Sequence, residues 1–367
     1  MPPTTFFTNT KVAEGEFDVD DMESILEDCH ALKMPSLLLS CHYRSKHESL
    51  ICFSNNEFYE NKLNTFPSAD DRERRVVYVP VKGIYQKGRK RSNRDEAQAV
   101  VNEIERRLTD EHLRRFSMGV ICFNVNQQYL IEDLLEARME KNRALKEWAE
   151  ESGEPIFIKN LENVQGDERD VILFSIGYGP DKEGKVSMNF GPLNLGGGER
   201  RLNVAITRSR YEMMVFSSLH ARDIDLRRTH AKGVEGLRRF LEYAETGTLV
   251  QNASLAEKES VEEVVTQQIA DQLALRGVQA ETFVGQSHLK VNIAILDPKD
   301  PQRYLLGILI DDKAYHRTPT MSDREIVHPT ALNSLGWQVK RVWTLDWFER
   351  PQHVIDAILN SVLNFRK

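Results

Sequence analysis

The chain has 367 residues, with 40% hydrophobic and 29% charged residues and a net charge of −7, which indicates a folded protein of more than one domain. No apolar run reaches the roughly 20 residues of a membrane span, and the first residues lack the basic and apolar parts of a signal peptide. The four cysteines form no CxxC pair, which favours reduced thiols over a zinc site or a disulfide framework. We therefore expect a cytoplasmic protein, whose nucleic-acid sites, if any, come from local basic patches.

Strands and helices alternate through the first two thirds of the chain. Residues 1–35 are polar and are expected to form a loop. The pattern then predicts helices and a set of strands in turn. The helices are expected at 47–59, 91–108, 126–140 and 198–210, and the strands at 36–44, 75–81, 117–123, 156–160, 171–178 and 213–219. This alternation is typical of an α/β fold with a covered parallel sheet.

A second α/β pattern follows a polar segment at residues 246–260, the best candidate for a linker. Residues 261–277 predict an amphipathic helix that ends at a glycine. Three strands, a helix, a strand and a final helix follow, so the order from 261 to 367 is αβββαβα.

One segment has the spacing of a phosphate loop, Gly179-x-x-x-x-Gly184-Lys185. A phosphate loop needs Ser or Thr after the lysine to hold magnesium, and a helix whose first amides face the phosphates. Val186 stands at the Ser/Thr position, and the Asn, Gly and Pro that follow are poor helix formers. We interpret the segment as a charged loop between strands, so nucleotide chemistry would need other residues.

Such residues occur near the ends of the predicted strands. Arg44, Gln165, Glu168 and Arg208 lie in polar segments next to apolar runs. The planar guanidinium of arginine stays charged and can spread over developing phosphoryl charge. Taken singly, each arginine is better explained by a surface ion pair. Their combination and order along the chain favour a shared site.

Residues 1 to about 245 closely resemble the second RecA-like domain of superfamily 1B DNA helicases. HYRSKHESLICFSNNEFY, ENVQGDERDVI and RRLNVAITRSR carry the resemblance. It implies that Arg44 reaches the γ-phosphate of ATP and that Arg208 is an arginine finger. It also implies that Glu168 contacts the nucleotide ribose, with Gln165 beside it.

The resemblance extends to nucleic-acid contacts. GVICFNVNQQ is similar to the helicase strand and loop that touch the nucleic-acid backbone, which implies Phe123 and Asn124. In the stretch YQKGRKRSNRD, Lys87, Arg89 and Arg91 could also contact phosphates. A solvated loop explains this basic stretch equally well.

The resemblance also indicates that helicase motifs expected before this segment are not in the sequence. MPPTTFF is similar to the tail of a helicase motif that follows the magnesium-binding acids, and no GxxxxGK[ST] occurs in the chain. We therefore expect the first RecA-like domain to lie upstream, in cis or as a separate subunit. ATP with Mg²⁺ is expected to bind only together with that missing N-terminal half, so the chain alone is not expected to hydrolyse ATP.

The αβββαβα region matches the core of PD-(D/E)xK nucleases, in which carboxylates on adjacent strands hold the Mg²⁺ that activates water. VNIAILDPKDP, LLGILIDDKAYH and LGWQVKRVWTLDW resemble the Vsr-like branch. The resemblance implies Asp311 as a metal ligand. Asn292 stands where an aspartate is expected, and Leu309 where Glu is frequent. Asp312 replaces a usual glycine and would point to the other face of its strand.

These observations predict a RecA-like parallel-sheet domain followed by a smaller restriction-endonuclease-like α/β domain. The expected division is a partial helicase motif and loop at 1–35, the RecA-like domain at 36–245, a linker at 246–260 and the nuclease-like domain at 261–367. The predicted function is that of a C-terminal fragment of an ATP-dependent helicase–nuclease acting on single- or double-stranded DNA. The alternative is a non-catalytic fragment that binds nucleic acid or a partner through a degenerate nuclease fold. Trp337, Trp343 and Trp347 are expected in the core.

Overall fold

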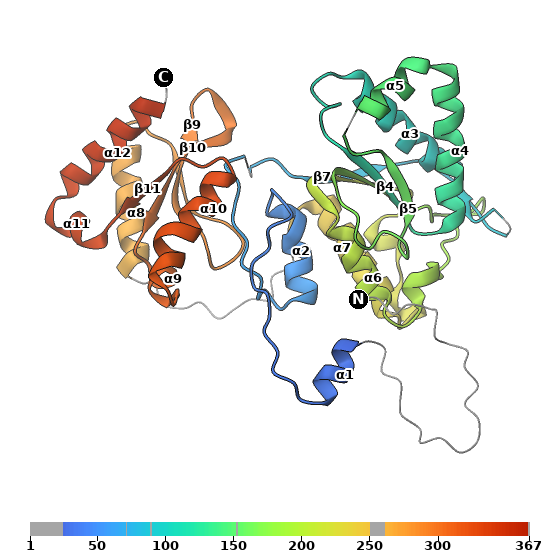
Figure 1. The fold of residues 1–367 in the computed structure, drawn as a ribbon, viewed down its shortest axis with the longest axis horizontal. Helices are drawn as coiled ribbons and strands as arrows, with labels where there is room; N and C mark the ends of the chain where they lie inside the picture. The colour runs from blue at the N-terminus through green and yellow to red at the C-terminus, as the bar shows by residue number, and fades with distance from the viewer. Residues whose placement is uncertain (1–24, 71, 89, 152, 250–260, 366–367) are drawn as a thin grey trace.

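The computed structural model describes residues 25–365 apart from 71, 89, 152 and 250–260. Its first unit, at the right of Figure 1, contains a five-stranded parallel sheet in the order β1-β7-β6-β4-β5. The interior strand β4 is buried along its whole length, as expected for a parallel sheet covered on both faces. The strands are β1 Val76–Pro80, β4 Met118–Cys122, β5 Phe157–Asn160, β6 Arg169–Ser175 and β7 Ser209–Ser217.

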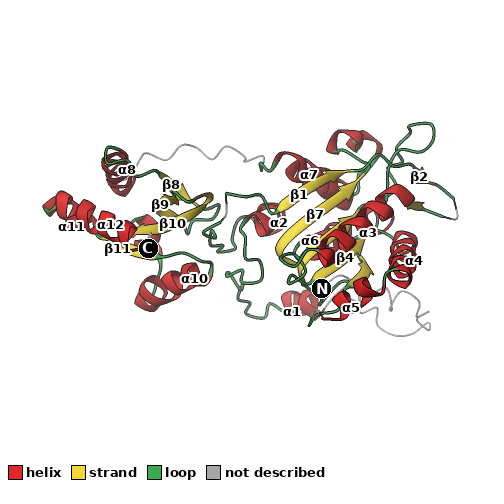
Figure 2. Cartoon of the chain, turned by 90° about the horizontal axis from the view of Figure 1, so that it is seen from above, coloured by secondary structure: helices red, strands yellow, loops and turns green. Residues whose placement is uncertain are grey.

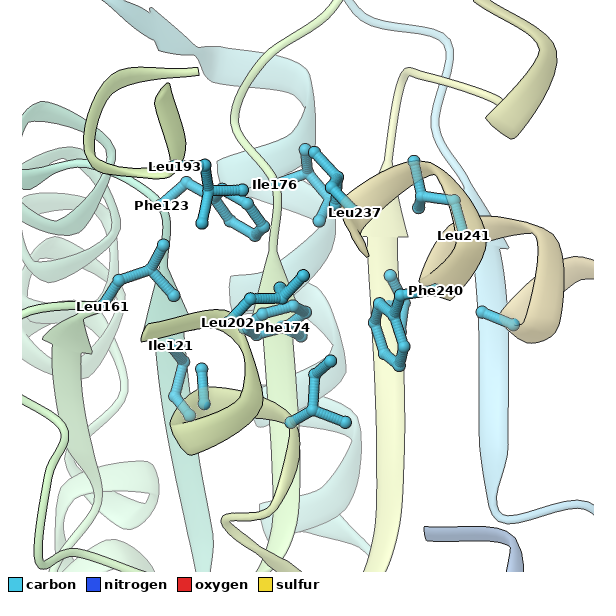
Figure 3. Close-up of a cluster of buried hydrophobic side chains, with 14 of the residues drawn as sticks. Ile121, Phe123, Leu161, Phe174, Ile176, Leu193, Leu202, Leu237, Phe240 and Leu241 are labelled. Atoms are coloured by element: carbon cyan, nitrogen blue, oxygen red, sulfur yellow. The ribbon is translucent and has the colours of Figure 1, made fainter. Parts of the chain in front are cut away.

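Two groups of helices cover the two faces of this sheet. Successive strand residues point to opposite faces, so Val120 packs with one group and Ile121 with the other. The first group is α3 Arg94–Thr109, α4 Val125–Lys141 and α5 Arg143–Glu151, and the second is α2 Ser49–Phe58, α6 Gly198–Ile206 and α7 Lys232–Thr246. Figure 3 shows the core under the second group, where Phe174 and Phe240 meet edge to face.

Two asparagines start the helices that follow β3 (Ser92–Asn93) and β4. The side-chain oxygen of Asn93 accepts the amide of Glu96 at 3.2 Å, and that of Asn124 accepts the amide of Gln127 at 2.9 Å. These are N-caps, which satisfy amides that the first helical turn leaves without a partner. Asn93 is therefore the N-cap of α3.

The second unit has a four-stranded sheet in the order β11-β10-β9-β8, with β8, β9 and β10 antiparallel and β11 parallel to β10. One face packs on α8 and α12, and the other packs around Trp337 and α10. This matches the predicted αβββαβα order, with the short α9 and α11 added. The elements are α8 Val261–Ala274, β8 Ala280–Val284, β9 Val291–Asp297, β10 Asp300–Ile310, α9 Lys313–Arg317, a π-helical turn Asp323–Val327, α10 His328–Ser334, β11 Val339–Val342, α11 Thr344–Glu349 and α12 Pro351–Phe365.

Residues 64–70, which we call the strap, join the core of the second unit although they precede β1. The indole Nε1 of Trp337 donates to the carbonyl of Pro67 at 2.8 Å. The Ala69 amide donates to Leu335 at 3.1 Å, and the Tyr304 amide donates to the Ala69 carbonyl at 2.7 Å. Ala69 and Trp337 are 2% and 1% exposed, so the strap is a buried part of this core.

Glu48, the residue before α2, holds the strap and the β8–β9 turn together. Its buried carboxylate accepts the amides of Gln286 at 2.7 Å and Ser287 at 3.1 Å, and also the Thr65 hydroxyl. The Ser287 hydroxyl in turn donates to the Thr65 carbonyl at 2.7 Å. Helix α2 consequently lies between the two units, as both views show (Figures 1 and 2).

The structure corrects three element predictions. The sequence predicts a loop at residues 1–35, but residues 25–31 form the helix α1 Ile25–Ala31, while residues 1–24 lie outside the described part of the chain. Residues 36–44 do not form a strand: they share a single bridge, Cys41 with Asn64, and Leu37 is 98% exposed. The apolar run favours extended backbone, but no sheet edge pairs with it. The helix predicted at 198–210 ends at Ile206, because Ser209 already begins β7. None of the helices in the described part of the chain is long and apolar enough to cross a membrane.

Candidate nucleotide and nucleic-acid sites

Three of the predicted nucleotide residues meet where β6 and β7 begin. Glu168 directly precedes β6 and Arg208 directly precedes β7, and these strands are parallel neighbours. Arg44 Nε lies 2.6 Å from Glu168 Oε2, across 124 positions of sequence. Arg44 Nη1 donates to the carbonyl of Thr207 at 3.4 Å. The fold therefore brings Arg44, Glu168 and the start of β7 to one place, while Gln165 is exposed on the loop before β6.

The charges of this site act on one another. The hydrogen bond and charge of Arg44 lower the pKa of Glu168, which stays ionised at neutral pH. Burial, then the charge of Arg44, lowers the pKa of Arg208 to about 10. Burial, followed by the charges of Arg44 and Arg208, lowers the pKa of His42 to about 4. At neutral pH the site thus combines the Arg44 and Arg208 cations, the Glu168 carboxylate and a neutral His42 imidazole, and a third cation, Arg210, lies 3.5 Å from Glu168.

The two arginines differ in accessibility. The side chain of Arg44 is 24% exposed, whereas Arg208 as a residue is 9% exposed. The Arg208 guanidinium donates to the carbonyl of Val204 at 2.6 Å, to the Thr207 hydroxyl at 3.0 Å and to the carbonyl of Asp167 at 3.4 Å. Either arginine must exchange acceptors to bind an incoming anion: Arg44 would leave Glu168, and Arg208 would leave these carbonyl and hydroxyl oxygens.

The structure corrects the prediction that Phe123 touches nucleic acid. Its ring is completely buried, 5.2 Å from the ring of Phe174, in the core drawn in Figure 3. The buried segment of β4 continues through Phe123, and the chain reaches the surface only at Asn124. Asn124 is half-buried and its oxygen caps α4. Of the neighbouring basic stretch, Lys87 pairs with Asp181 at 2.5 Å, Arg91 is exposed, and Arg89 lies outside the described residues.

The segment with phosphate-loop spacing is an irregular loop. Lys185 pairs with Glu183 at 2.9 Å, and the Lys185 amide donates to the Asp181 carboxylate. A short 3-10 turn, Gly191–Asn194, is the next helical element. No helix N-terminus therefore follows Lys185, as the interpretation of this segment as a loop requires.

A buried polar network, which the sequence did not lead us to predict, lies at the opposite end of the sheet, where β6 ends. Glu96 is fully buried, and its Oε1 accepts the Ser175 hydroxyl at 2.7 Å and the Gly177 amide at 2.6 Å. Gln127 donates to Ser175 at 3.1 Å and accepts the Asn93 amide at 2.8 Å. Burial raises the pKa of the Glu96 carboxyl to about 8. A signal existed, because Glu96 shares the apolar helical stripe of α3.

In the second unit the structure pairs Asn292 with Asp312, not with Asp311. Asn292 Nδ2 donates to Asp312 Oδ2 at 2.7 Å. Asp311 accepts the amide and hydroxyl of Thr344, at 2.7 and 2.6 Å, on the β11 side. The expectation that Asp312 points away is therefore wrong, because β10 ends at Ile310 and strand alternation stops there.

The donor atoms around Asn292 do not fit a Mg²⁺ ion, which depends on several carboxylate oxygens. The single oxygen of Asn292 already accepts the Ile310 amide at 2.8 Å. Asp312 caps α9 by accepting the Tyr315 amide at 2.9 Å, and Leu309 is apolar. Within the described ranges, no group of three or more His, Cys, Asp or Glu side chains could hold a metal ion.

Comparison with known proteins gives matches for both units. Residues 22–220 match the family model AAA_12, an AAA domain, and residues 266–362 match REase_MTES_1575, a restriction-endonuclease-like domain. An uncharacterized ATP-dependent helicase of Mycoplasma pneumoniae is 32% identical over 394 residues, covering 99% of this chain and 34% of that protein. A second, from Mycoplasma genitalium, is 37% identical over 264 residues, covering 67% of this chain and 22% of that protein.

A solved structure is also similar. It is the C-terminal domain of a possible DNA helicase from Lactobacillus plantarum, 14% identical, with a TM-score of 0.26 over 47% of this chain and 85% of that chain. The chain spans about a third or less of the length of the two curated relatives it matches. The AAA_12 model covers more than half of the residues. The chain belongs to the AAA domain family AAA_12 and carries a restriction-endonuclease-like domain after it.

Proposed function

We propose that this chain supplies one side of the ATP site of a superfamily 1 DNA helicase, and that another half carries the phosphate loop. The observation that supports this best is the meeting of Arg44, Glu168 and Arg208 at the starts of β6 and β7. The guanidinium groups of Arg44 and Arg208 stay charged and suit a triphosphate, while the neighbouring Arg210 is paired with Glu154 and Asp170. The helicase names of the two relatives agree with this proposal.

Each residue would have a distinct role. The γ-phosphate would replace Glu168 as the partner of Arg44, because both are oxygen anions and Arg44 is the exposed guanidinium. Arg208 would move from its carbonyl acceptors to spread over the developing phosphoryl charge. Glu168, once released, would hold the ribose, with Gln165 beside it. Bound Mg²⁺, held by the other half, would neutralise phosphate charge.

The test is ATP hydrolysis by this chain mixed with the half that carries GxxxxGK[ST], in the presence of single-stranded DNA. Arg44→Ala and Arg208→Ala should each lower the rate by about 10³-fold, the usual effect of losing an arginine finger. Arg276→Ala, at the exposed end of α8, is the matched control and should leave the rate unchanged. Hydrolysis by this chain alone, or a normal rate with Arg44→Ala, would contradict the proposal.

A second candidate function concerns the nuclease-like domain, which we infer to be Vsr-like in origin. The Asn292–Asp312 hydrogen bond and the apolar Leu309 favour binding without cleavage. The experiment is cleavage of labelled DNA in Mg²⁺ or Mn²⁺, with Asp311→Ala and Asn292→Asp beside the wild-type chain. If the wild-type chain cleaves DNA and Asp311→Ala abolishes that cleavage, the domain is instead a metal-dependent endonuclease.

A further inference from the structure

A pocket of the second unit opens on the side of β9 and β10 where Asn292 lies. Its lining includes three cations, Lys290, Arg324 and Arg341, against one carboxylate, Asp312. That carboxylate is already occupied on both oxygens, by Asn292 and by the Tyr315 amide. The pocket therefore offers more positive than negative charge to a ligand.

Two of these cations converge on one aromatic ring. The guanidinium carbons of Arg324 and Arg341 lie 5.1 and 4.8 Å from the centre of the Tyr315 ring. A guanidinium stacked on a ring can still donate its remaining N–H groups to an oxygen anion; Arg341 Nη2 already donates to the Arg324 carbonyl at 3.0 Å. Arg341 lies 3.4 Å from Glu325, whereas no described carboxylate pairs with Arg324 or Lys290. The charges of Arg324 and Lys290 are therefore available to an anionic ligand.

An aromatic side chain adjoins the cations. Trp343 is 40% exposed, unlike the buried Trp337 and Trp347, so the expectation that all three lie in the core is wrong for Trp343. Its ring lies 5.6 Å from the Arg341 guanidinium and 5.7 Å from the Tyr315 ring. A half-open aromatic beside paired arginines can stack a base while the arginines hold its phosphate.

We propose that this pocket holds single-stranded nucleic acid without a metal ion, with Arg324, Arg341 and Lys290 on a backbone phosphate and Trp343 under a base. The inference rests on the proposed nucleic-acid role of the chain, and it gives the nuclease-like fold a holding function. Asn292 fits this role, because a neutral amide at its position does not repel a phosphate as an aspartate would.

The experiment measures binding of the full chain to a fluorescein-labelled oligothymidylate in EDTA, without nucleotide, at several salt concentrations. Arg324→Gln should weaken binding several-fold and lower the slope of log K against log salt by about 0.7, the value for one phosphate contact on a single strand. Asn292→Asp, similar in size but charged, should also weaken binding. Arg276→Gln removes a charge from the same domain away from the pocket and should bind like the wild-type chain.

Each other outcome is decisive. If Arg324→Gln and Asn292→Asp both bind like the wild-type chain, with an unchanged salt slope, the pocket assignment is wrong while other nucleic-acid contacts stand. If the wild-type chain binds no oligonucleotide, the pocket and the nucleic-acid role fail together. Release of the oligonucleotide by micromolar inorganic phosphate would assign the pocket to a free anion and overturn the proposal. Circular dichroism of each variant checks that it is folded.

Discussion

Glu48→Gln should loosen the junction between the two units. Oε1 of Glu48 accepts Ser287 N and Oε2 accepts Gln286 N. Whichever way the new amide is turned, its NH₂ group faces one of these backbone donors. One buried amide then loses its acceptor, and the other bond loses its charge. Together these changes cost about 2–4 kcal/mol.

The assay is amide hydrogen exchange of the peptide that contains Gln286 and Ser287. If these amides exchange by local opening of the junction, the predicted loss corresponds to exchange faster by about 30- to 700-fold. Glu60→Gln is the control, because that carboxylate is exposed and pairs with Lys62 at the surface. Unchanged exchange in Glu48→Gln would refute the view that the carboxylate holds the β8–β9 turn.

Three further predictions concern buried groups. The pKa of Glu96 is raised to about 8, so the stability that the acid form contributes is complete below pH 4.5 and is lost as the pH rises towards 8. Glu96→Gln, which keeps the acceptor oxygen, should therefore gain stability relative to wild type between pH 5 and pH 8 in urea unfolding; an equal difference at both pH values would contradict this. Phe123→Ala should lower the unfolding free energy by about 3–5 kcal/mol, because the ring is buried in the core. If the variant instead bound DNA more weakly and kept its stability, Phe123 would be a nucleic-acid contact after all. Trp337→Phe should cost about 1–3 kcal/mol, because the Pro67 carbonyl loses its donor, and an unchanged urea midpoint would show that water replaces the indole.

The alternation of apolar strand segments with helical segments predicted the parallel sheet. The apolar segments are indeed the buried parts of β4 and β6. The resemblance assigned Arg44 and Glu168 to one nucleotide site but did not predict that they touch, and periodicity alone could not bring together residues 124 positions apart. Phe123 was misjudged because a motif gives a position in the chain and no direction for the side chain.

The nuclease-like site shows a second limit of sequence reasoning. The sequence showed that Asn292 replaces an aspartate, but it did not show that Asn292 bonds to Asp312. Strand alternation predicted that Asp312 points to the opposite face, but alternation does not apply to Asp312 because β10 ends at Ile310. Arg324 and Arg341 were not singled out, because their common feature is the Tyr315 ring, which only the fold supplies.

The strap changes how the boundary between the two units should be understood. The second unit is attached twice, once through the covalent connection at 250–260 and once through the Pro67 and Ala69 hydrogen bonds. Cleavage of the covalent connection alone would leave the two pieces associated. An exchange of the segment after residue 260 between relatives would have to bring a matching strap, or Trp337 would face a foreign partner. The unit that evolution can move as one piece is therefore discontinuous in sequence.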